Sequence, residues 1–149
     1  IDHHKIWDFT TSDPVFIRTE AICSTNSILY KMFKEKWFEI SEKMAKLMLS
    51  AILSDSLNFR SATTTKEDVQ IWKELNKIAK IKNLEEYVKK MFDAKSDLNW
   101  FSIKEIIKSD YKNFNFNWIK AWIWTLETTN PNFALDKKDE ILKWLEKIK

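Results

Sequence analysis

The stretch that decides the fold is Leu47-Met48-Leu49-Ser50-Ala51-Ile52-Leu53-Ser54-Asp55-Ser56-Leu57. Its residues 47–53 are apolar nearly all round, and a helix with that pattern is buried on most sides. Ser41 can cap this helix, which we expect to run to about Leu57. Asp55 lies near its end, where a buried carboxylate is costly unless it is paired or bound to a metal. The stretch therefore predicts the core of a globular domain with one conspicuous acid.

Helix-start signals stand on both sides of this stretch. Ser24 can cap an upstream helix, because a serine oxygen accepts a backbone N–H of the first turn. The apolar face of that helix would comprise Ile28, Leu29, Met32 and Phe33. Downstream, Thr63-Thr64-Thr65 followed by Glu67 and Asp68 is typical of a helix start. With a further helix expected over about residues 84–94, the first part of the chain is predicted to be mainly helical.

The pattern changes toward the C-terminus. After a polar linker at residues 96–101, Ser102 begins a short helix that ends near Asp110. The spacing of the next apolar residues predicts two short strands, paired as a hairpin around Asn117-Trp118. Asn130-Pro131 ends this run, and one final amphipathic helix follows. Because new strands follow a set of helices, we expect a second domain to begin near residue 102.

Composition narrows the class of protein. The chain has 149 residues, of which 44% are hydrophobic and 32% charged, as in a globular protein and unlike a disordered tail. A net charge of +3, spread along the chain, argues against a nucleic-acid or membrane-surface binder. No apolar run reaches the roughly 20 residues that span a bilayer. A single cysteine excludes an internal disulfide, so we expect a cytoplasmic protein.

The residues that could carry chemistry begin with His3 and His4, the only histidines, next to Asp2. Imidazole is a common metal ligand and a neighbouring carboxylate can fix its tautomer, although two exposed histidines can also be inert. Asp55 could bind a metal, face a loop, or pair with Arg60 or a lysine. The residues alone leave these alternatives open.

Two further residues carry weaker signals. Lys112 is one of many lysines, and by composition it is an ordinary solvated charge. Cys23 could in principle be a nucleophile, but a small buried thiol is the simpler interpretation.

Beyond these generic signals, the chain resembles the family II inorganic pyrophosphatases of the DHH phosphoesterase superfamily. The resemblance is densest in the block Leu47 to Leu57, and the Asp-His-His run is shared by the whole superfamily. Other segments that fit are Ile1 to Ile6, Phe9, Pro14, Arg18, Glu20, Ser24-Thr25, Ile28 to Met32, Thr63 to Thr65, Asp97-Leu98, Asp110 to Lys112 and Thr125 to Pro131. The resemblance therefore spans essentially the whole chain.

The resemblance implies an α/β fold and a domain division. Residues 1–95 would be the mainly helical C-terminal part of a DHH catalytic domain, and residues 96–101 would be the linker. Residues 102–149 would begin a second, substrate-binding α/β domain with a β-hairpin and a helix.

The resemblance also implies a function and a role for each site residue. The parent enzyme would hydrolyse inorganic pyrophosphate at a dinuclear Mn2+ or Co2+ centre, with Mg2+ accompanying the substrate. His3 matches a ligand of one metal, and Asp55 matches a carboxylate shared by both. His4 and Lys112 match catalytic residues that contact phosphate, and Asp2 would support the histidines. A cytoplasmic homodimer is implied for the full-length protein.

Several family signatures have no counterpart in the sequence. The His-x-x-x-Asp-x-Asp motif, another ligand aspartate and the Ser-Arg-Lys-Lys segment are all missing. One histidine and one aspartate cannot hold two metals, so we expect an internal fragment that binds metal weakly and hydrolyses no pyrophosphate. The alternatives are another DHH phosphoesterase, acting on short oligonucleotides or phosphonucleotides, and a non-catalytic remnant.

The absence of glycine is the strangest feature of the composition. Chains average roughly 7% glycine, whereas this sequence has none and carries eight tryptophans. Trp118, Trp122 and Trp124 stand most clearly where the family pattern or a turn expects glycine, and Trp37, Trp100 and Trp7 also fit. If five bulky residues were held at positive φ, they would cost roughly 5–10 kcal/mol. We therefore hypothesise that many of these tryptophans are glycines, encoded by UGA in an AT-rich genome.

Overall fold

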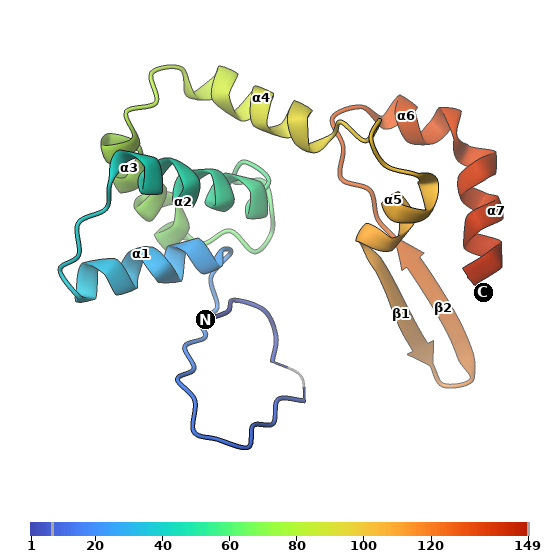
Figure 1. Ribbon diagram of the computed structural model, residues 1–149, viewed down its shortest axis with the longest axis horizontal. Helices are drawn as coiled ribbons and strands as arrows, with labels where there is room; N and C mark the ends of the chain where they lie inside the picture. The colour runs from blue at the N-terminus through green and yellow to red at the C-terminus, as the bar shows by residue number, and fades with distance from the viewer. Residues whose placement is uncertain (7, 149) are drawn as a thin grey trace. The chain divides into compact units, whose positions relative to one another are not determined.

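The chain folds into two units, each with its own core (Figure 1). The computed structural model describes residues 1–6 and 8–148, and its internal contacts divide the chain after Val88. The division falls inside helix α4 (Leu84–Lys95), before the predicted linker at residues 96–101. In the described part of the chain, no helix is both long enough and apolar enough to cross a membrane.

The first unit contains three helices that begin where their capping residues predict. They are α1 (Thr25–Glu35), α2 (Glu42–Asp55) and α3 (Lys66–Ala79). Ser24, Ser41 and Thr65 each occupy the N-cap, and each accepts a backbone N–H of the following turn. At α3 the arrangement is a full capping box, because Asp68 also accepts the backbone N–H of Thr65. The three predicted helix starts are confirmed.

Helix α2 lies at the centre of the first unit and packs against both α1 and α3. The fully buried apolar side chains of this core are Ile28, Met48, Leu49, Ile52, Leu53 and Leu75. The expectation that α2 is apolar and buried nearly all round is wrong at Leu47, whose side chain is 67% exposed. Contacts with two helices cover only part of the α2 surface, and Leu47 lies outside that part.

The described residues before α1 form a loop whose two ends pair with each other. A parallel bridge joins Asp2 to Thr19, with Asp2 N donating to the Arg18 carbonyl at 3.1 Å. The Arg18 guanidinium in turn donates two hydrogen bonds to Glu35 of α1, at 2.5 and 2.7 Å. These contacts join the two ends of the loop to each other and to the last residue of α1. Trp7 lies outside the described residues.

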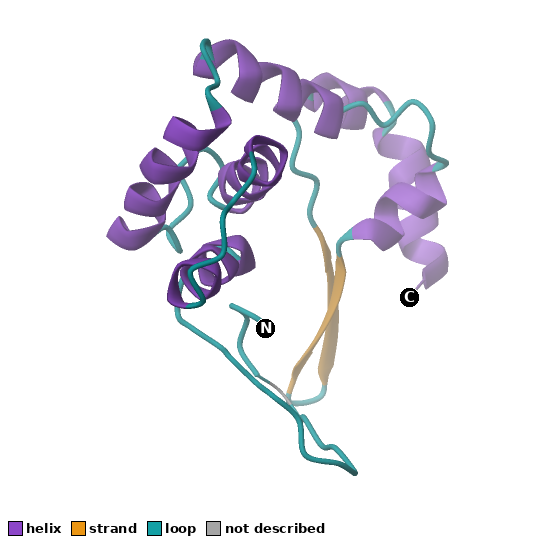
Figure 2. Ribbon diagram, turned by 60° about the vertical axis from the view of Figure 1, so that its left-hand side comes forward, coloured by secondary structure: helices purple, strands orange, loops and turns teal. Residues whose placement is uncertain are grey.

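The second unit combines short helices with one antiparallel hairpin, drawn in orange in Figure 2. Its elements after α4 are α5 (Ile103–Ser109), β1 (Tyr111–Phe116), β2 (Ile119–Trp124), α6 (Pro131–Asp136) and α7 (Lys138–Ile148). Its buried core comprises Ile103, Ile106, Ile107 and Ile141. Phe116 pairs with Ile119, so the hairpin turns at Asn117-Trp118 as predicted. The single final helix predicted there is instead two helices, which meet at Lys137.

One tryptophan has the backbone conformation that the glycine hypothesis expects, and the other described tryptophans do not. Among residues 1–6 and 8–148, Trp37 is the one tryptophan with positive φ, at 59°. It follows α1 as the residue at which helices commonly place glycine, and its side chain is 92% exposed. Trp122 and Trp124 lie inside strand β2, so no turn requires glycine there. The expected penalty from five strained sites is therefore wrong.

Candidate metal centre

The Asp2-His3-His4 run forms a compact group of possible metal ligands. One ligand atom from each of the three residues lies within 4.8 Å of the others. Asp2 organises the group, because its Oδ1 accepts hydrogen bonds from His3 N at 2.8 Å and His4 N at 3.2 Å. The same oxygen contacts His4 Nδ1 at 2.8 Å. The backbone and one imidazole are thus held around a single carboxylate oxygen.

Asp2 is fully ionised at neutral pH. The hydrogen bond from the His4 side chain, assisted by that from the His4 backbone, lowers the pKa of Asp2 to about 2. A carboxylate with two adjacent imidazoles supplies the negative charge and the nitrogen donors that a divalent cation prefers. The arrangement therefore favours a cation over an anion directly at Asp2.

His3 is held by the first residue of α1. Its Nδ1 lies 2.8 Å from Oγ1 of Thr25, a contact between residues 22 positions apart. His3 is half-buried, and its ring lies 4.0 Å from that of His4, centroid to centroid. One ring nitrogen of His3 is thus engaged by the protein, which leaves Nε2 available for a ligand.

Asp55 is held from the same end of α1. Ser24, the N-cap of α1, donates its hydroxyl hydrogen to Oδ2 of Asp55 at 2.7 Å. Helices α1 and α2 run in opposite directions, so the start of one lies beside the end of the other (Figure 1). Asp55 is exposed, so the cost of burying a carboxylate at the end of an apolar helix does not arise. Its exposure leaves the second oxygen accessible.

The electrostatic setting of Asp55 favours a bound cation. It is the last residue of α2, where the helix dipole is negative and a carboxylate is unfavourable. The last turn of α2 contains no basic residue, and the described residues place no lysine or arginine in an ion pair with Asp55. The guanidinium of Arg60 instead donates to the carbonyl of Leu57 at 3.1 Å. The alternative in which Asp55 pairs with Arg60 is therefore not observed.

A left-handed turn follows Asp55 directly. Leu57, Asn58 and Phe59 have φ values of 50°, 54° and 63°. Outside glycine, such values cost roughly 1–2 kcal/mol per residue. Asn58 N donates to the Leu53 carbonyl at 2.9 Å and Phe59 N donates to Ser56 Oγ at 3.1 Å, which hold the turn in place. The strain ends α2 abruptly and leaves Asp55 at its tip.

The donor set fits a divalent cation that prefers nitrogen and oxygen ligands. In each of the four side chains, one nitrogen or oxygen atom is hydrogen-bonded within the protein, and the second can bind a metal. The four residues are Asp2, His3, His4 and Asp55. Asp55 is not part of the group of three mutually close ligands. It is linked to His3 through adjacent residues at the start of α1, because Ser24 contacts Asp55 and Thr25 contacts His3. The residues therefore fit one partly formed metal position better than two complete ones.

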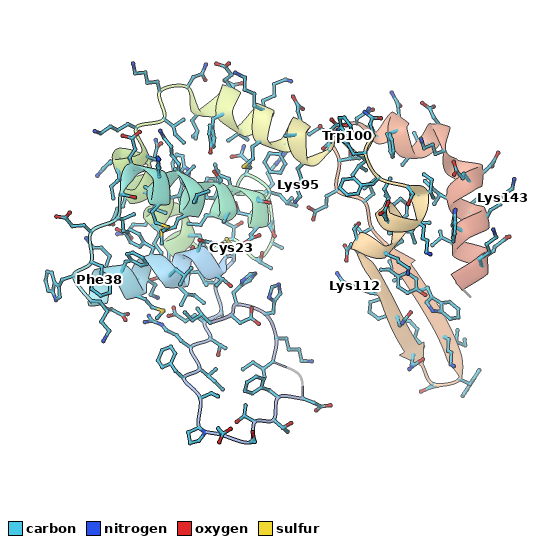
Figure 3. The ribbon with its side chains drawn as sticks, viewed as in Figure 1. Cys23, Phe38, Lys95, Trp100, Lys112 and Lys143 are labelled. Atoms are coloured by element: carbon cyan, nitrogen blue, oxygen red, sulfur yellow. The ribbon has the colours of Figure 1, made fainter. Side chains whose placement is uncertain are left out.

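Two further residues were candidates from the sequence. Lys112 is on β1 in the second unit, where its exposed ammonium lies 3.2 Å from Oδ1 of Asp110. Cys23 lies at the start of α1 (Figure 3), is buried, and has the pKa of its thiol raised to about 12 by that burial. A thiol with so high a pKa is protonated at neutral pH and is not a nucleophile, as the sequence predicted.

Asp68 is a buried acid whose full role the sequence did not reveal. Besides capping α3, it accepts hydrogen bonds from Cys23 N at 3.1 Å and from Ser27 Oγ at 2.6 Å. Burial alone would raise the pKa of Asp68, but the hydrogen bonds from Ser27 and Thr65 outweigh it and hold the pKa below its usual range. Asp68 thus ties the start of α3 to the residues that precede and begin α1.

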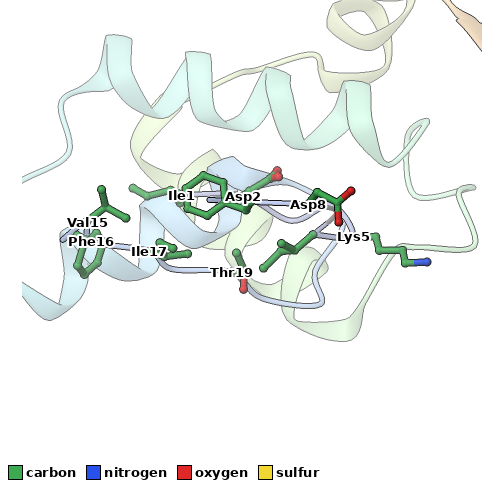
Figure 4. A pocket seen from close by; sticks show the side chains of 10 residues that line it. Ile1, Asp2, Lys5, Asp8, Val15, Phe16, Ile17 and Thr19 are labelled. Carbon is green, nitrogen blue, oxygen red and sulfur yellow. The ribbon is translucent and has the colours of Figure 1, made fainter. Parts of the chain in front are cut away.

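The hollow beside this group is apolar. It measures about 530 Å³ and is enclosed by the N-terminal segment, with Asp2 and Lys5 on its wall (Figure 4). Its other walls include Ile1, Phe9, Val15, Phe16 and Ile17. A cavity of this character does not suit a highly charged anion, and we assign it no part in phosphate binding.

The second unit is similar to a known domain family. Residues 89–149 match the model of the DHHA2 domain. This match begins at the residue where the contacts divide the chain.

Comparison with individual proteins extends the similarity over the whole chain. It is 39% identical over 156 aligned residues to a probable manganese-dependent inorganic pyrophosphatase of Deinococcus radiodurans, covering 100% of this chain and 49% of that protein. The corresponding protein of Clostridium acetobutylicum is 41% identical, with 100% and 48% covered. A crystal structure from Methanococcus jannaschii, described as a putative family II inorganic pyrophosphatase, matches with a TM-score of 0.82 at 34% identity. That match covers 98% of this chain and 50% of the other, so the chain spans about half the length of these relatives.

Proposed function

The chain is a relative of the family II inorganic pyrophosphatases, and on that ground we propose that it forms part of an enzyme that hydrolyses inorganic pyrophosphate with manganese. The observation that carries the proposal is the approach of His3 and Asp55 to two adjacent hydroxyls at the start of α1. Residues more than 50 positions apart thus meet at the same end of one helix. Their types, imidazole and carboxylate, are those expected of a metal centre.

Each residue of the centre has a proposed role. His3 and Asp55 bind metal, and Asp2 orients both histidines through its Oδ1. His4 is mostly exposed, and Nδ1 is engaged with Asp2, so the protonated ring can donate a hydrogen bond from Nε2–H to a phosphate oxygen of the substrate. Manganese, when bound, supplies a Lewis acid and lowers the pKa of a coordinated water. The protein residues hold the charges and orientations that this chemistry requires.

Lys112 is proposed to bind phosphate from the second unit. Its ammonium is exposed and paired only loosely with Asp110, so a phosphate oxygen can replace that carboxylate at little cost. Neutralisation of the leaving phosphate by a cationic side chain is a general requirement of phosphoryl transfer. We retain residues 1–95, 96–101 and 102–149 as the proposed catalytic part, linker and start of the substrate-binding domain.

Finer properties of the parent enzyme are proposed with the same function. Co2+ can replace Mn2+, because both accept the nitrogen and oxygen donors found here, and Mg2+ accompanies the charged substrate. The chain with a single buried cysteine suits a reducing cytoplasm. The parent enzyme is proposed to be a homodimer with pyrophosphate, and not nucleic acid or membrane, as its partner.

The test is release of phosphate from pyrophosphate in the presence of Mn2+. The complete product of the gene should release phosphate, and the His3→Ala and Asp55→Asn variants should each lose most of this activity. Asp13→Asn is the matched control, because Asp13 is an exposed acid of the same segment that accepts hydrogen bonds from its neighbours Ser12 and Thr11. The 149-residue chain by itself should release none. Full activity of the His3→Ala variant, or no activity of the complete product, would contradict the proposal.

A further inference from the structure

Two adjacent residues at the start of α1 contact the two candidate metal ligands. Ser24 Oγ lies 2.7 Å from Asp55 Oδ2, and Thr25 Oγ1 lies 2.8 Å from His3 Nδ1. The contacts span 31 and 22 positions of the sequence, so neither follows from local geometry. Ligands from two distant parts of the chain are therefore held by one rigid dipeptide.

The donor and acceptor capacity of Ser24 fixes the direction of its contact. Its oxygen accepts the backbone N–H of Asn26 at 3.3 Å as the cap of α1. Its single hydroxyl hydrogen is left to donate, and Asp55 is an acceptor-only carboxylate. Ser24 is fully buried, so water does not compete for that hydrogen. Oδ2 of Asp55 is thereby held, while Oδ1 accepts no hydrogen bond from the described residues.

The contact of Thr25 determines which nitrogen of His3 can bind a metal. If Thr25 Oγ1 accepts a hydrogen bond from Nδ1–H, then Nε2 carries the free lone pair. Metal-binding histidines commonly have their other nitrogen engaged in this way, which fixes both the tautomer and the ring orientation. Thr25 is half-buried at the first position of an 11-residue helix, so its hydroxyl is well placed to hold the ring.

We propose that Ser24 and Thr25 are positioning residues that hold Asp55 and His3, respectively, in the orientation that binds a divalent cation. This inference rests on the proposed function, because it takes His3 and Asp55 as metal ligands. It assigns to Ser24 and Thr25 a role that neither the helix cap nor the core requires. Both would act on the cation through the ligands and not by direct contact.

Four variants test the proposal. Thr25→Val keeps the shape of the side chain and removes the hydroxyl, whereas Thr25→Ser keeps the hydroxyl. Ser24→Gly removes the contact with Asp55 while glycine still serves as an acceptable N-cap. Ser27→Ala is the matched control, because Ser27 also lies on α1 and bonds a carboxylate, but that carboxylate is Asp68.

The first measurement needs neither metal nor activity. In the metal-free chain labelled with ¹⁵N, the imidazole nitrogen shifts of His3 should report a proton on Nδ1 and none on Nε2. Thr25→Val should produce a mixture of tautomers, and Thr25→Ser should restore the wild-type shifts. A proton on Nε2 in the wild type, or shifts that Thr25→Val leaves unchanged, would overturn the role of Thr25.

The second measurement is the dissociation constant for Mn2+, followed by the paramagnetic resonance signal of the free ion. Thr25→Val and Ser24→Gly should each weaken binding about 10- to 100-fold. Ser27→Ala should lower the thermal midpoint without changing that constant. Equal weakening by Ser27→Ala, or none by the other two variants, would show that the hydroxyls serve only the fold. If the imidazole shifts and Mn2+ affinities are as predicted but the protein does not hydrolyse pyrophosphate, the proposed function is wrong and the positioning role of Ser24 and Thr25 still holds.

Discussion

Asp68 of α3 accepts a hydrogen bond from the backbone N–H of Cys23, 45 residues earlier in the chain, at 3.1 Å. Cys23 directly precedes the two residues that hold Asp55 and His3. The carboxylate of Asp68 also caps its own helix through Thr65. One buried acid therefore fixes the segment on which the candidate centre is built.

Replacement of Asp68 should destabilise the first unit strongly. The two carboxylate oxygens of Asp68 accept four hydrogen bonds, and Asp68→Asn replaces one oxygen with an NH2 group, which leaves at least one buried donor without a partner. We expect a loss of about 2–4 kcal/mol in the free energy of unfolding, measured by urea denaturation. Glu67→Gln is the control, because Glu67 is half exposed and makes a single ion pair with Lys31. A similar loss in both variants would contradict the role given to Asp68.

Acid should weaken the first unit in a predictable direction. A hydrogen bond from Lys31 lowers the pKa of Glu20. The hydrogen bonds that Asp68 accepts lower its pKa by more than its burial raises it. Both carboxylates therefore have a lower pKa in the folded chain than in the unfolded chain. The unfolded state then binds more protons, and stability falls as pH drops below the ordinary carboxylate pKa of about 4. The thermal midpoint should be nearly flat above this pH and decrease below it. The decrease should be shallower in Asp68→Asn, and an equally steep decrease would exclude Asp68 as a cause.

Replacement of Trp37 by glycine should stabilise the chain. Trp37 has φ of 59° after α1, and its exposed side chain contributes little packing. Glycine removes a conformational cost of roughly 1–2 kcal/mol, partly offset by its greater freedom in the unfolded state. We expect a net gain of up to about 1 kcal/mol in the free energy of unfolding.

Trp144→Gly provides the contrast to Trp37→Gly. Trp144 packs against the core of the second unit, so its loss should destabilise. The intact mass of the protein from its native source tests the glycine hypothesis itself. A mass that matches the sequence with all eight tryptophans would exclude it.

Lys112→Ala should weaken substrate binding and leave the stability of the chain nearly unchanged. The ion pair of Lys112 with Asp110 is exposed, so its loss should change the free energy of unfolding by less than about 1 kcal/mol. In the complete gene product the same variant should raise KM for pyrophosphate without changing the affinity for Mn2+. Lys120→Ala, on the neighbouring strand β2, is the matched control. An unchanged KM would remove Lys112 from the site.

The local parts of the fold could be predicted from the sequence, because their signals lie within a few residues of each other. Ser24, Ser41 and Thr65 cap the helices they were expected to cap, and the hairpin turns at Asn117. The break at Lys137 was missed, because neither glycine nor proline marks it. Helix α7 packs against α5, a contact that sequence periodicity does not reveal.

The candidate site could likewise be predicted only in part from the sequence. Residue types and resemblance singled out His3, His4 and Asp55, whereas the hydroxyls that hold them were visible only as a helix cap and its neighbour. A hydrogen bond between Ser24 and Asp55 joins residues 31 positions apart, and its formation depends on how α1 packs beside α2. Asp68 likewise showed only its capping role, because its contact with Cys23 crosses 45 positions.

We propose that His3 and Asp55 bind the same cation. A double-mutant cycle measures it most directly, through the Mn2+ dissociation constants of the complete gene product and of its His3→Ala, Asp55→Asn and doubly substituted variants. Two ligands of one ion act as a unit, so the double variant should bind hardly more weakly than either single variant. Effects that simply add would place the two residues at separate sites, and unchanged affinity in either single variant would remove that residue from the centre.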